Sequence, residues 1–399
     1  MVRLSLGLGR DNTRIFLGMI FNEGGLGIYQ TLWPIYIASL GASPPQIGLV
    51  IGLLGLCRLV FLIPSGMLSD RLPPRTLIVS ARLVAAFGTF LLGLAQSWWH
   101  LIPGVFILSA GTIAFPALSS TIAERAGNGW ARTRAFTLIY TVGPSAAYLI
   151  TPTLGGFIAQ HVSLRALLFI SAGLTATGAA IFSTIERGSV SSHDGPPVTY
   201  RSALVERPIR LVLMLMFATI FVLTMGVTLA PNFLQEVHSI SIEHIGWLGS
   251  GAAIGSAMLG LLINRVGPLR RPLAGIALGI TAVAGMLGLL LVGRGFLWFA
   301  VAYLLRGGFM LAWSTFYAAL GEVSSERLRG RVYALAELLA GAGMAAAPFV
   351  AGWLYGWRPQ APMVASLLTI PLLLLAIATV ARLLRTEQPS EPALVEEHV

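Results

Sequence analysis

Four ionisable side chains lie inside long apolar stretches of this sequence, where charge is costly. They are Glu23, Arg58, Arg306 and Glu337, two of each sign. Residues of this kind are usually retained because they face a cavity or a partner. A carboxylate that meets no cation there favours the proton-bound form, whereas an ion pair keeps it charged. The four residues are therefore candidates for chemistry that takes up and releases a proton.

Depth along a helix indicates which of these side chains can meet. The helical rise of about 1.5 Å per residue places Glu23 roughly 13 Å beyond Arg14, and Arg58 roughly 12 Å from Gly66. Both depths are counted from the same side of the apolar layer, so a direct ion pair between Glu23 and Arg58 is possible. Such a pair would be either a switch that exchanges a proton or a permanent structural contact.

The surroundings of the other two residues, Glu337 and Arg306, and of a fifth charge, Arg82, are less defined. The same helical rise puts Glu337 about 9 Å beyond Arg331, where it is either a protonation site or packs beside a Ser, Tyr or Arg. Arg306 lies deep in its stretch and is expected to face an anionic group or Glu337. Arg82 lies nearer the end of its stretch and is expected to extend to the cytoplasmic surface.

Composition identifies the elements that must position these residues. The chain has 399 residues, of which 56% are hydrophobic and 11% charged, whereas a soluble domain carries about 25% charged residues. The formal charge of +10 comes from arginines in short breaks between apolar runs. That distribution is typical of a membrane protein and not of a nucleic-acid-binding surface. A single cysteine, Cys57, excludes an internal disulfide.

Twelve membrane spans are predicted, as helices, because lipid leaves no partner for open backbone groups. Hydropathy and breaking residues place them at 15–40, 46–66, 76–96, 100–123, 134–159, 164–184, 209–234, 244–263, 272–292, 296–320, 331–356 and 361–384. If both termini are cytoplasmic, only Arg165, Arg294 and Arg358 fall on outer ends. The excess of positive charge on cytoplasmic ends favours this orientation.

The chain divides into two similar halves. We expect a six-helix bundle at 1–186, a cytoplasmic linker at 187–208, a second six-helix bundle at 209–385 and an acidic tail at 386–399. TLWP at 31–34 recurs as TLAP at 228–231, and other short matches follow in the same order about half a chain apart. Two parallel repeats predict a site at their interface that opens alternately to each side of the membrane.

One loop carries a resemblance to a known family. In GMLSDRLPPR, the residues Gly66, Leu68, Asp70, Arg71 and Arg75 match the loop between helices 2 and 3 of the major facilitator superfamily, with departures at Pro73 and Pro74. The second half keeps Gly260, Leu262, Arg265 and Gly267. This resemblance implies a gate in which Asp70 contacts the start of the helix near Arg331 when the cytoplasmic side is closed.

A second motif points to a subgroup of that family. The span at 134–159 resembles the antiporter pattern of helix 5 at Pro152, Gly155 and Gly156, with Ala147 and Thr151 in place of the two leading glycines. This resemblance favours export. The arginine motif of helix 4 is missing, because Ile107 and Ala110 stand where Arg and Gln would be.

The family resemblance also implies which helices line the substrate cavity. In this sequence they would contribute Asn22, Tyr29, Gln30, Trp33, Tyr36, Ser109, Thr112, Phe115, Thr224, Met225, Thr228, Asn232, Trp313, Ser314 and Tyr317. A lining of aromatic rings with scattered hydrogen-bonding groups suits an amphipathic organic molecule better than an inorganic ion.

The sequence therefore predicts a secondary active transporter of small organic solutes, with proton-coupled efflux as the leading mechanism. The alternatives are an uptake permease or facilitator for sugars or organic acids, and a non-transporting membrane sensor. No phosphate-binding loop and no metal-spaced histidines occur, so we expect no cofactor, no metal and no enzymatic activity. The expected partners are a small-molecule substrate, protons and lipid, with no nucleic acid. We expect a monomer in a bacterial inner membrane.

Overall fold

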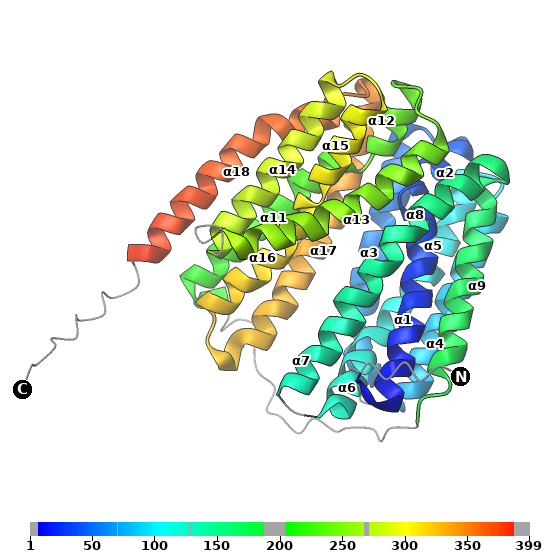
Figure 1. Cartoon of the computed structure of the whole chain (residues 1–399), viewed down its shortest axis with the longest axis vertical. Helices are drawn as coiled ribbons and strands as arrows, with labels where there is room; N and C mark the ends of the chain where they lie inside the picture. The colour runs from blue at the N-terminus through cyan, green and yellow to red at the C-terminus, as the bar shows by residue number, and fades with distance from the viewer. Residues whose placement is uncertain (1–6, 70, 128, 187–203, 267–270, 387–399) are drawn as a thin grey trace, which may run out of the picture.

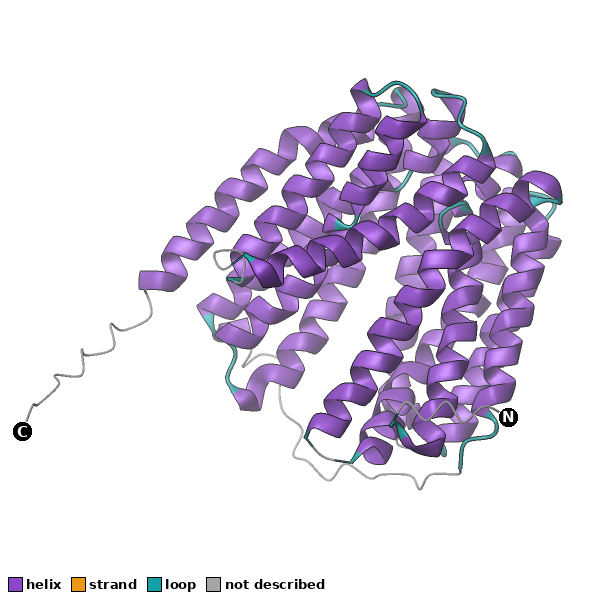
Figure 2. Ribbon diagram, viewed as in Figure 1, coloured by secondary structure: helices purple, strands orange, loops and turns teal. Residues whose placement is uncertain are grey.

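The computed structural model describes residues 7–69, 71–127, 129–186, 204–266 and 271–386. Within these ranges the chain forms helices and turns but no strand (Figure 2). Ten helices of the described chain are long and apolar enough to cross a membrane. The helices α1 (Gly9–Gln30) and α8 (Gly143–His161) are not among these ten, but they run alongside them (Figure 1), which is consistent with the twelve spans expected. The predicted linker and tail lie mostly outside the described residues.

The first half is built from short and long helices in chain order. These are α1 (Gly9–Gln30), α2 (Trp33–Ser39), α3 (Pro44–Ser69), α4 (Pro74–Leu94), η1 (Trp98–His100), α5 (Leu101–Ser109), η2 (Ala110–Ile113), α6 (Ala114–Ala126), α7 (Trp130–Thr137), η3 (Leu138–Val142), α8 (Gly143–His161) and α9 (Leu164–Phe182).

The second half repeats the plan with fewer interruptions. It contains α11 (Arg207–Val227), α12 (Ala230–Glu236), α13 (Ile242–Arg265), α14 (Pro272–Val292), α15 (Phe296–Arg306), α16 (Gly308–Val323), α17 (Glu326–Trp357) and α18 (Ala361–Thr386).

The repeated TLxP segments break the same helix in each half. In the first half α1 ends at Gln30 and α2 begins at Trp33, with Pro34 at its second position. In the second half α11 ends at Val227 and α12 begins at Ala230, again with a proline next. Proline lacks the N–H that would continue the preceding helix, and it is tolerated in a first turn. The sequence repeat is therefore also a repeat of local structure.

Serine caps fix the starts of two helices that follow short turns. The Ser163 hydroxyl accepts a hydrogen bond from the Ala166 N–H at 3.1 Å at the start of α9. The Ser241 hydroxyl accepts one from the His244 N–H at 3.3 Å at the start of α13. Each cap satisfies a backbone donor that the first turn of a helix leaves free.

The two halves lie side by side and contact each other at one end of the molecule, around α2 and α12 (Figure 1). We call this the contact end. Toward the other end, where α3 finishes and α17 begins, the two bundles separate; we call this the diverging end. The most extensive contacts between the halves are those of α3 with α17 and of α8 with α13.

Glycines allow these helices to meet backbone to backbone. A Cβ atom added at Gly246 of α13 would lie 2.6 Å from the Cα of Gly156 in α8. A Cβ at Gly48 of α3 would lie 2.1 Å from the Pro348 carbonyl oxygen of α17. Neither distance admits a side chain. The helix 5 motif residue Gly155 likewise faces the backbone of α1, so the motif glycines serve close helix packing.

Polar contacts join the halves at the same end. The Thr153 and Ser250 hydroxyls are 2.8 Å apart, and the Asn232 side-chain amide donates to the Pro34 carbonyl at 3.4 Å. A nitrogen of the His161 ring lies 3.4 Å from the Glu243 carboxylate.

The diverging end carries the residues of the expected gate. Asp70 lies outside the described residues, so its contact with the start of α17 stays a prediction. Arg71, Arg75 and Arg265 form no ion pair within the described part of the chain.

Near this end, the buried side chain of Asp11 connects several helices of the first half. The Asp11 side chain is 6% exposed and forms ion pairs with Arg14, at 3.2 Å, and with Arg125 of α6. It also accepts a hydrogen bond from the Glu186 backbone N–H, just beyond α9. The cluster ties α1, α6 and the end of α9 together, so the first half can move as one body.

We predict that Gly246→Leu separates the halves at the contact end. Overpacking costs about 1–3 kcal/mol, which would shift a two-state equilibrium roughly 5- to 150-fold away from this conformation. The measurement is thiol accessibility of a cysteine introduced at this end, in a Cys57→Ser background.

Gly251→Leu, on the same helix, is the matched control, because a Cβ at Gly251 meets nothing within 4 Å. Equal accessibility in the two variants would show that glycine packing does not hold this end closed.

Candidate functional site

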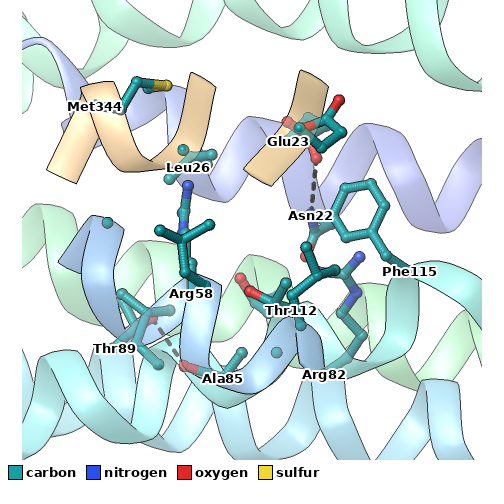
Figure 3. Close-up of a pocket in the computed structure, with 18 of the residues that line it drawn as sticks. Asn22, Glu23, Leu26, Arg58, Arg82, Ala85, Thr89, Thr112, Phe115 and Met344 are labelled. Atoms are coloured by element: carbon teal, nitrogen blue, oxygen red, sulfur yellow. Dashed lines mark hydrogen bonds between the residues drawn. The ribbon is translucent and has the colours of Figure 1, made fainter. Parts of the chain in front are cut away.

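A cavity of about 600 Å³ lies between the two halves (Figure 3). The first half contributes residues from α1, α3, α4, α5, η2, α6 and α9, and the second half contributes residues from α16 and α17. The lining residues are Asn22, Glu23, Leu26, Tyr29, Gly55, Arg58, Leu59, Leu62, Arg82, Ala85, Thr89, Leu108, Gly111, Thr112, Phe115, Ser171, Thr175, Phe309, Met310, Trp313, Glu337, Gly341 and Met344.

The two walls of this cavity differ in chemistry. Most of the charge is on the first half, in Glu23, Arg58 and Arg82. The wall from the second half is largely apolar and aromatic, apart from Glu337. Such a cavity can bind an apolar body on one side and a polar group on the other.

Glu23 lies in the cavity without an ion pair. Its carboxylate accepts a hydrogen bond of 2.9 Å from the Asn22 side-chain amide (Figure 3). Within the described residues no arginine nitrogen lies within 4.0 Å of it. It interacts electrostatically with Arg82 and, more weakly, with Arg58. Of the two possibilities left open by the sequence, the direct ion pair between Glu23 and Arg58 is therefore not formed, although both side chains line the same cavity.

Arg82 differs from its expectation. Its side chain does not reach the surface; the residue is 7% exposed and lines the cavity. Its Nε and Nη2 atoms are buried without a hydrogen-bond partner in the described chain. The reason is the face of the helix it occupies, because Ile78, Ala85 and Thr89 at helical spacing are also buried.

Glu337 has a tyrosine partner, which is one of the alternatives considered from the sequence. The Tyr317 hydroxyl donates a hydrogen bond to the Glu337 carboxylate. Glu337 is exposed and lines the cavity. The expected contact of Arg306 with Glu337 is not formed. The Arg306 guanidinium instead lies 5.6 Å from the centre of the Tyr303 ring, and this residue does not line the cavity.

Several other residues expected in the lining lie elsewhere. Asn22, Tyr29, Thr112, Phe115 and Trp313 line the cavity. The expected residues that do not line it are Gln30, Trp33, Tyr36, Ser109, Thr224, Met225, Thr228, Asn232, Ser314 and Tyr317.

The helix breaks explain part of this difference. Trp33, Tyr36 and Asn232 lie beyond the TLxP breaks, in the packed contact end. There the Tyr36 hydroxyl donates to the Leu92 carbonyl at 2.7 Å. Ser109 is buried and bonds within its own helix to the Val105 carbonyl at 2.7 Å.

Other lining residues come from helices that the family resemblance did not bring forward. They are Arg82 and Thr89 on α4, Ser171 and Thr175 on α9, and Gly341 and Met344 on α17. Small and hydroxyl-bearing residues at helical spacing on apolar helices were their signal in the sequence.

Comparison with known proteins agrees with this architecture. The profile of the Major Facilitator Superfamily matches residues 15–243 and 211–398. The chain therefore belongs to the Major Facilitator Superfamily and is a multi-pass membrane transporter of that family.

Two curated relatives share parts of the sequence. The inner membrane transport protein YajR of Escherichia coli (strain K12) is 35% identical over 171 residues, which cover 41% of this chain and 36% of YajR. The match thus spans little more than a third of that relative. The multidrug resistance protein MdtG of Salmonella choleraesuis (strain SC-B67) is 26% identical over 285 residues, covering 65% of this chain and 68% of MdtG.

Solved structures share the fold at low identity. The nucleoside transporter NupG superposes with a TM-score of 0.76 at 13% identity, covering 94% of this chain and 99% of NupG. A bacterial homolog of the human lysosomal transporter Spinster, in an inward-facing and unoccupied conformation, gives a TM-score of 0.75 at 16% identity, covering 96% and 98%.

We predict that Thr112→Cys and Ser109→Cys differ in thiol reactivity, although both residues lie in the same membrane span, Trp98–Ala126. In a Cys57→Ser background, a water-soluble maleimide should label Thr112→Cys, which lines the cavity, and leave Ser109→Cys largely unlabelled. Labelling would be followed in membranes by mass shift, with the denatured protein as the full-labelling control. Equal labelling rates would place the cavity wall elsewhere.

Proposed function

We propose that this chain moves small amphipathic organic solutes across a bacterial inner membrane by alternating access, with proton-coupled efflux as the leading mechanism. The observation that supports this most is the cavity shared by two repeats, which are packed tightly at one end and separated at the other. Rocking of the two repeats about such a site would expose it to each side in turn.

The charge distribution supports an orientation. Arg71 follows the end of α3, Arg75 lies in the first turn of α4, and Arg265 is the last residue of α13. The helix α3 ends at the diverging end (Figure 1), and positive charge concentrates on the cytoplasmic side of membrane proteins. In this orientation both termini are cytoplasmic and the cavity opens inward. A single chain supplies both walls of the cavity, which supports a monomer as the working unit.

Similarity to MdtG and the helix 5 motif support efflux, because that relative is named for multidrug resistance. The aromatic and methionine-rich wall formed by Phe309, Met310, Trp313 and Met344 can adapt to varied apolar bodies. A second candidate function is uptake of an organic acid. It is favoured by one specific observation: Arg82 lines the cavity, and its Nε and Nη2 atoms have no hydrogen-bond partner among the described residues.

Glu23 is the proposed proton-coupling residue. It is held by a single side-chain hydrogen bond and lies within the electrostatic reach of two cations. Adding or removing its proton changes the charge of the first-half wall by one unit, in a place where water screens charge poorly. Glu337 is the second candidate, in the opposite wall.

We predict that Glu23→Gln abolishes proton-coupled transport while the protein still folds and binds solute. Substrate-dependent proton flux, measured with a pH dye inside proteoliposomes, should fall to the level of empty vesicles. Glu322→Gln is the matched control, because Glu322 is an exposed acid on α16 outside the cavity. Proton flux that persists in Glu23→Gln would remove this residue from the coupling step.

A further inference from the structure

Arg82 lines the cavity, and two of its side-chain nitrogens have no hydrogen-bond partner among the described residues. The Arg82 guanidinium is buried, yet its Nε and Nη2 atoms meet no acceptor among the described residues. A buried donor without a partner carries its desolvation cost uncompensated, and a charged donor more so. Membrane proteins that retain such a group generally use it to contact something that enters the site.

The nearest acid does not fill this role. The Glu23 carboxylate acts on Arg82 electrostatically, but no nitrogen of Arg82 lies within the 4.0 Å of an ion pair. The hydrogen bond that Glu23 accepts comes from Asn22 instead. In Figure 3 the Arg82 side chain extends toward the region of Asn22 and Phe115. Arg82 lines the cavity, but its Nε and Nη2 atoms are themselves buried, so a solute reaches them when the side chain turns toward the cavity.

The surroundings define the chemistry of that solute. Arg58, on α3, adds a second cation to the same wall and is itself exposed. The opposite wall offers Met310, Trp313 and Met344 for an apolar body. A guanidinium presents two parallel N–H donors, which match the two oxygens of a carboxylate or the oxygens of a sulfonate.

We propose that Arg82 is a substrate-recognition residue, and that the transported solutes are amphipathic organic anions whose acidic head binds Arg82 while their apolar body rests on α16 and α17. This inference rests on the proposed transport function and names its substrate class. The group bound by Arg82 is therefore an oxyanion. Arg58, in the same wall of the cavity, adds positive charge that favours the same ligand.

The test compares ligands that share a body and differ in the head group. Phenylbutyrate, phenylbutanamide and phenylbutylamine, with naphthylacetate and its amide as a second body, are titrated into the full chain in nanodiscs of zwitterionic lipid. We expect each acid to bind about 10- to 100-fold more tightly than its amide, the range for a hydrogen bond to a charged group. The amine should bind more weakly than the amide.

Variants assign that preference to one side chain. Arg82→Gln should remove the preference for the acid and leave binding of the amide unchanged, and Arg82→Lys should restore only part of it, because an ammonium lacks the paired donors. Arg306→Gln, which neutralises an arginine outside the cavity, should keep the full preference. The melting temperature of ligand-free Arg82→Gln should equal or exceed that of the parent chain, because a purely structural arginine would lower it on removal.

Several outcomes would overturn the inference. They are acids that bind no better than their amides, a preference that survives Arg82→Gln, or a large loss of stability in ligand-free Arg82→Gln. A further arm replaces part of the lipid with phosphatidylglycerol. Arg82-dependent stabilisation by that lipid alone would assign the site to a headgroup and not to a solute. If the chain still binds the amides and transports solutes but shows no preference for acids, this inference fails and the proposed transport function is unaffected.

Discussion

Backbone contact between the two halves at one end is the constraint on which the rest of this structure depends. Gly48 against α17, and Gly156 against Gly246, bring helices together without side chains between them. Larger residues would separate the halves, and the polar contacts beside the glycines, such as Thr153 with Ser250, would be lost. Because the halves are held together here, they are free to separate elsewhere, and the cavity occupies that separation.

The division of charge between the walls follows from the cost of charge in an apolar layer. Glu23, Arg58 and Arg82 share one water-accessible space, so none of them has to face lipid. The cavity wall from the second half consists largely of aromatic rings and methionines, and Glu337, the acid among its described lining residues, accepts a hydrogen bond from Tyr317. A cavity built in this way separates recognition of a polar head from accommodation of an apolar body.

Much of the fold followed from the sequence, because apolar length and breaking residues are local signals. The TLxP match revealed the repeat, but the predicted spans at 15–40 and 209–234 were unbroken, and the helix break at each TLxP segment came from the structure. Charge inside apolar runs brought Glu23, Arg58 and Glu337 to attention. Depth alone misplaced Arg82, because distance from a helix end does not say which face a residue occupies. Trp33 and Tyr36 were expected in the cavity and do not line it. The family resemblance indicates which helices line the cavity, but it does not indicate how far along each helix the cavity extends. Pairings between distant helices, such as Glu337 with Tyr317, require the packed structure.

Rigid-body rocking places a condition on how a proton can drive this molecule. Glu23, Arg58 and Arg82 all belong to the first half, so rocking leaves their mutual distances nearly unchanged. A ligand shifts an equilibrium only by binding its two states differently. A proton on Glu23 can therefore drive rocking only if the changed charge is sensed across the cavity, by a group whose distance from Glu23 depends on the conformation. Glu337 is the acid that the described second-half wall offers for this, and Tyr317 positions it. If a proton drives the rocking, the coupling therefore has to act between the two walls of the cavity and not within one of them.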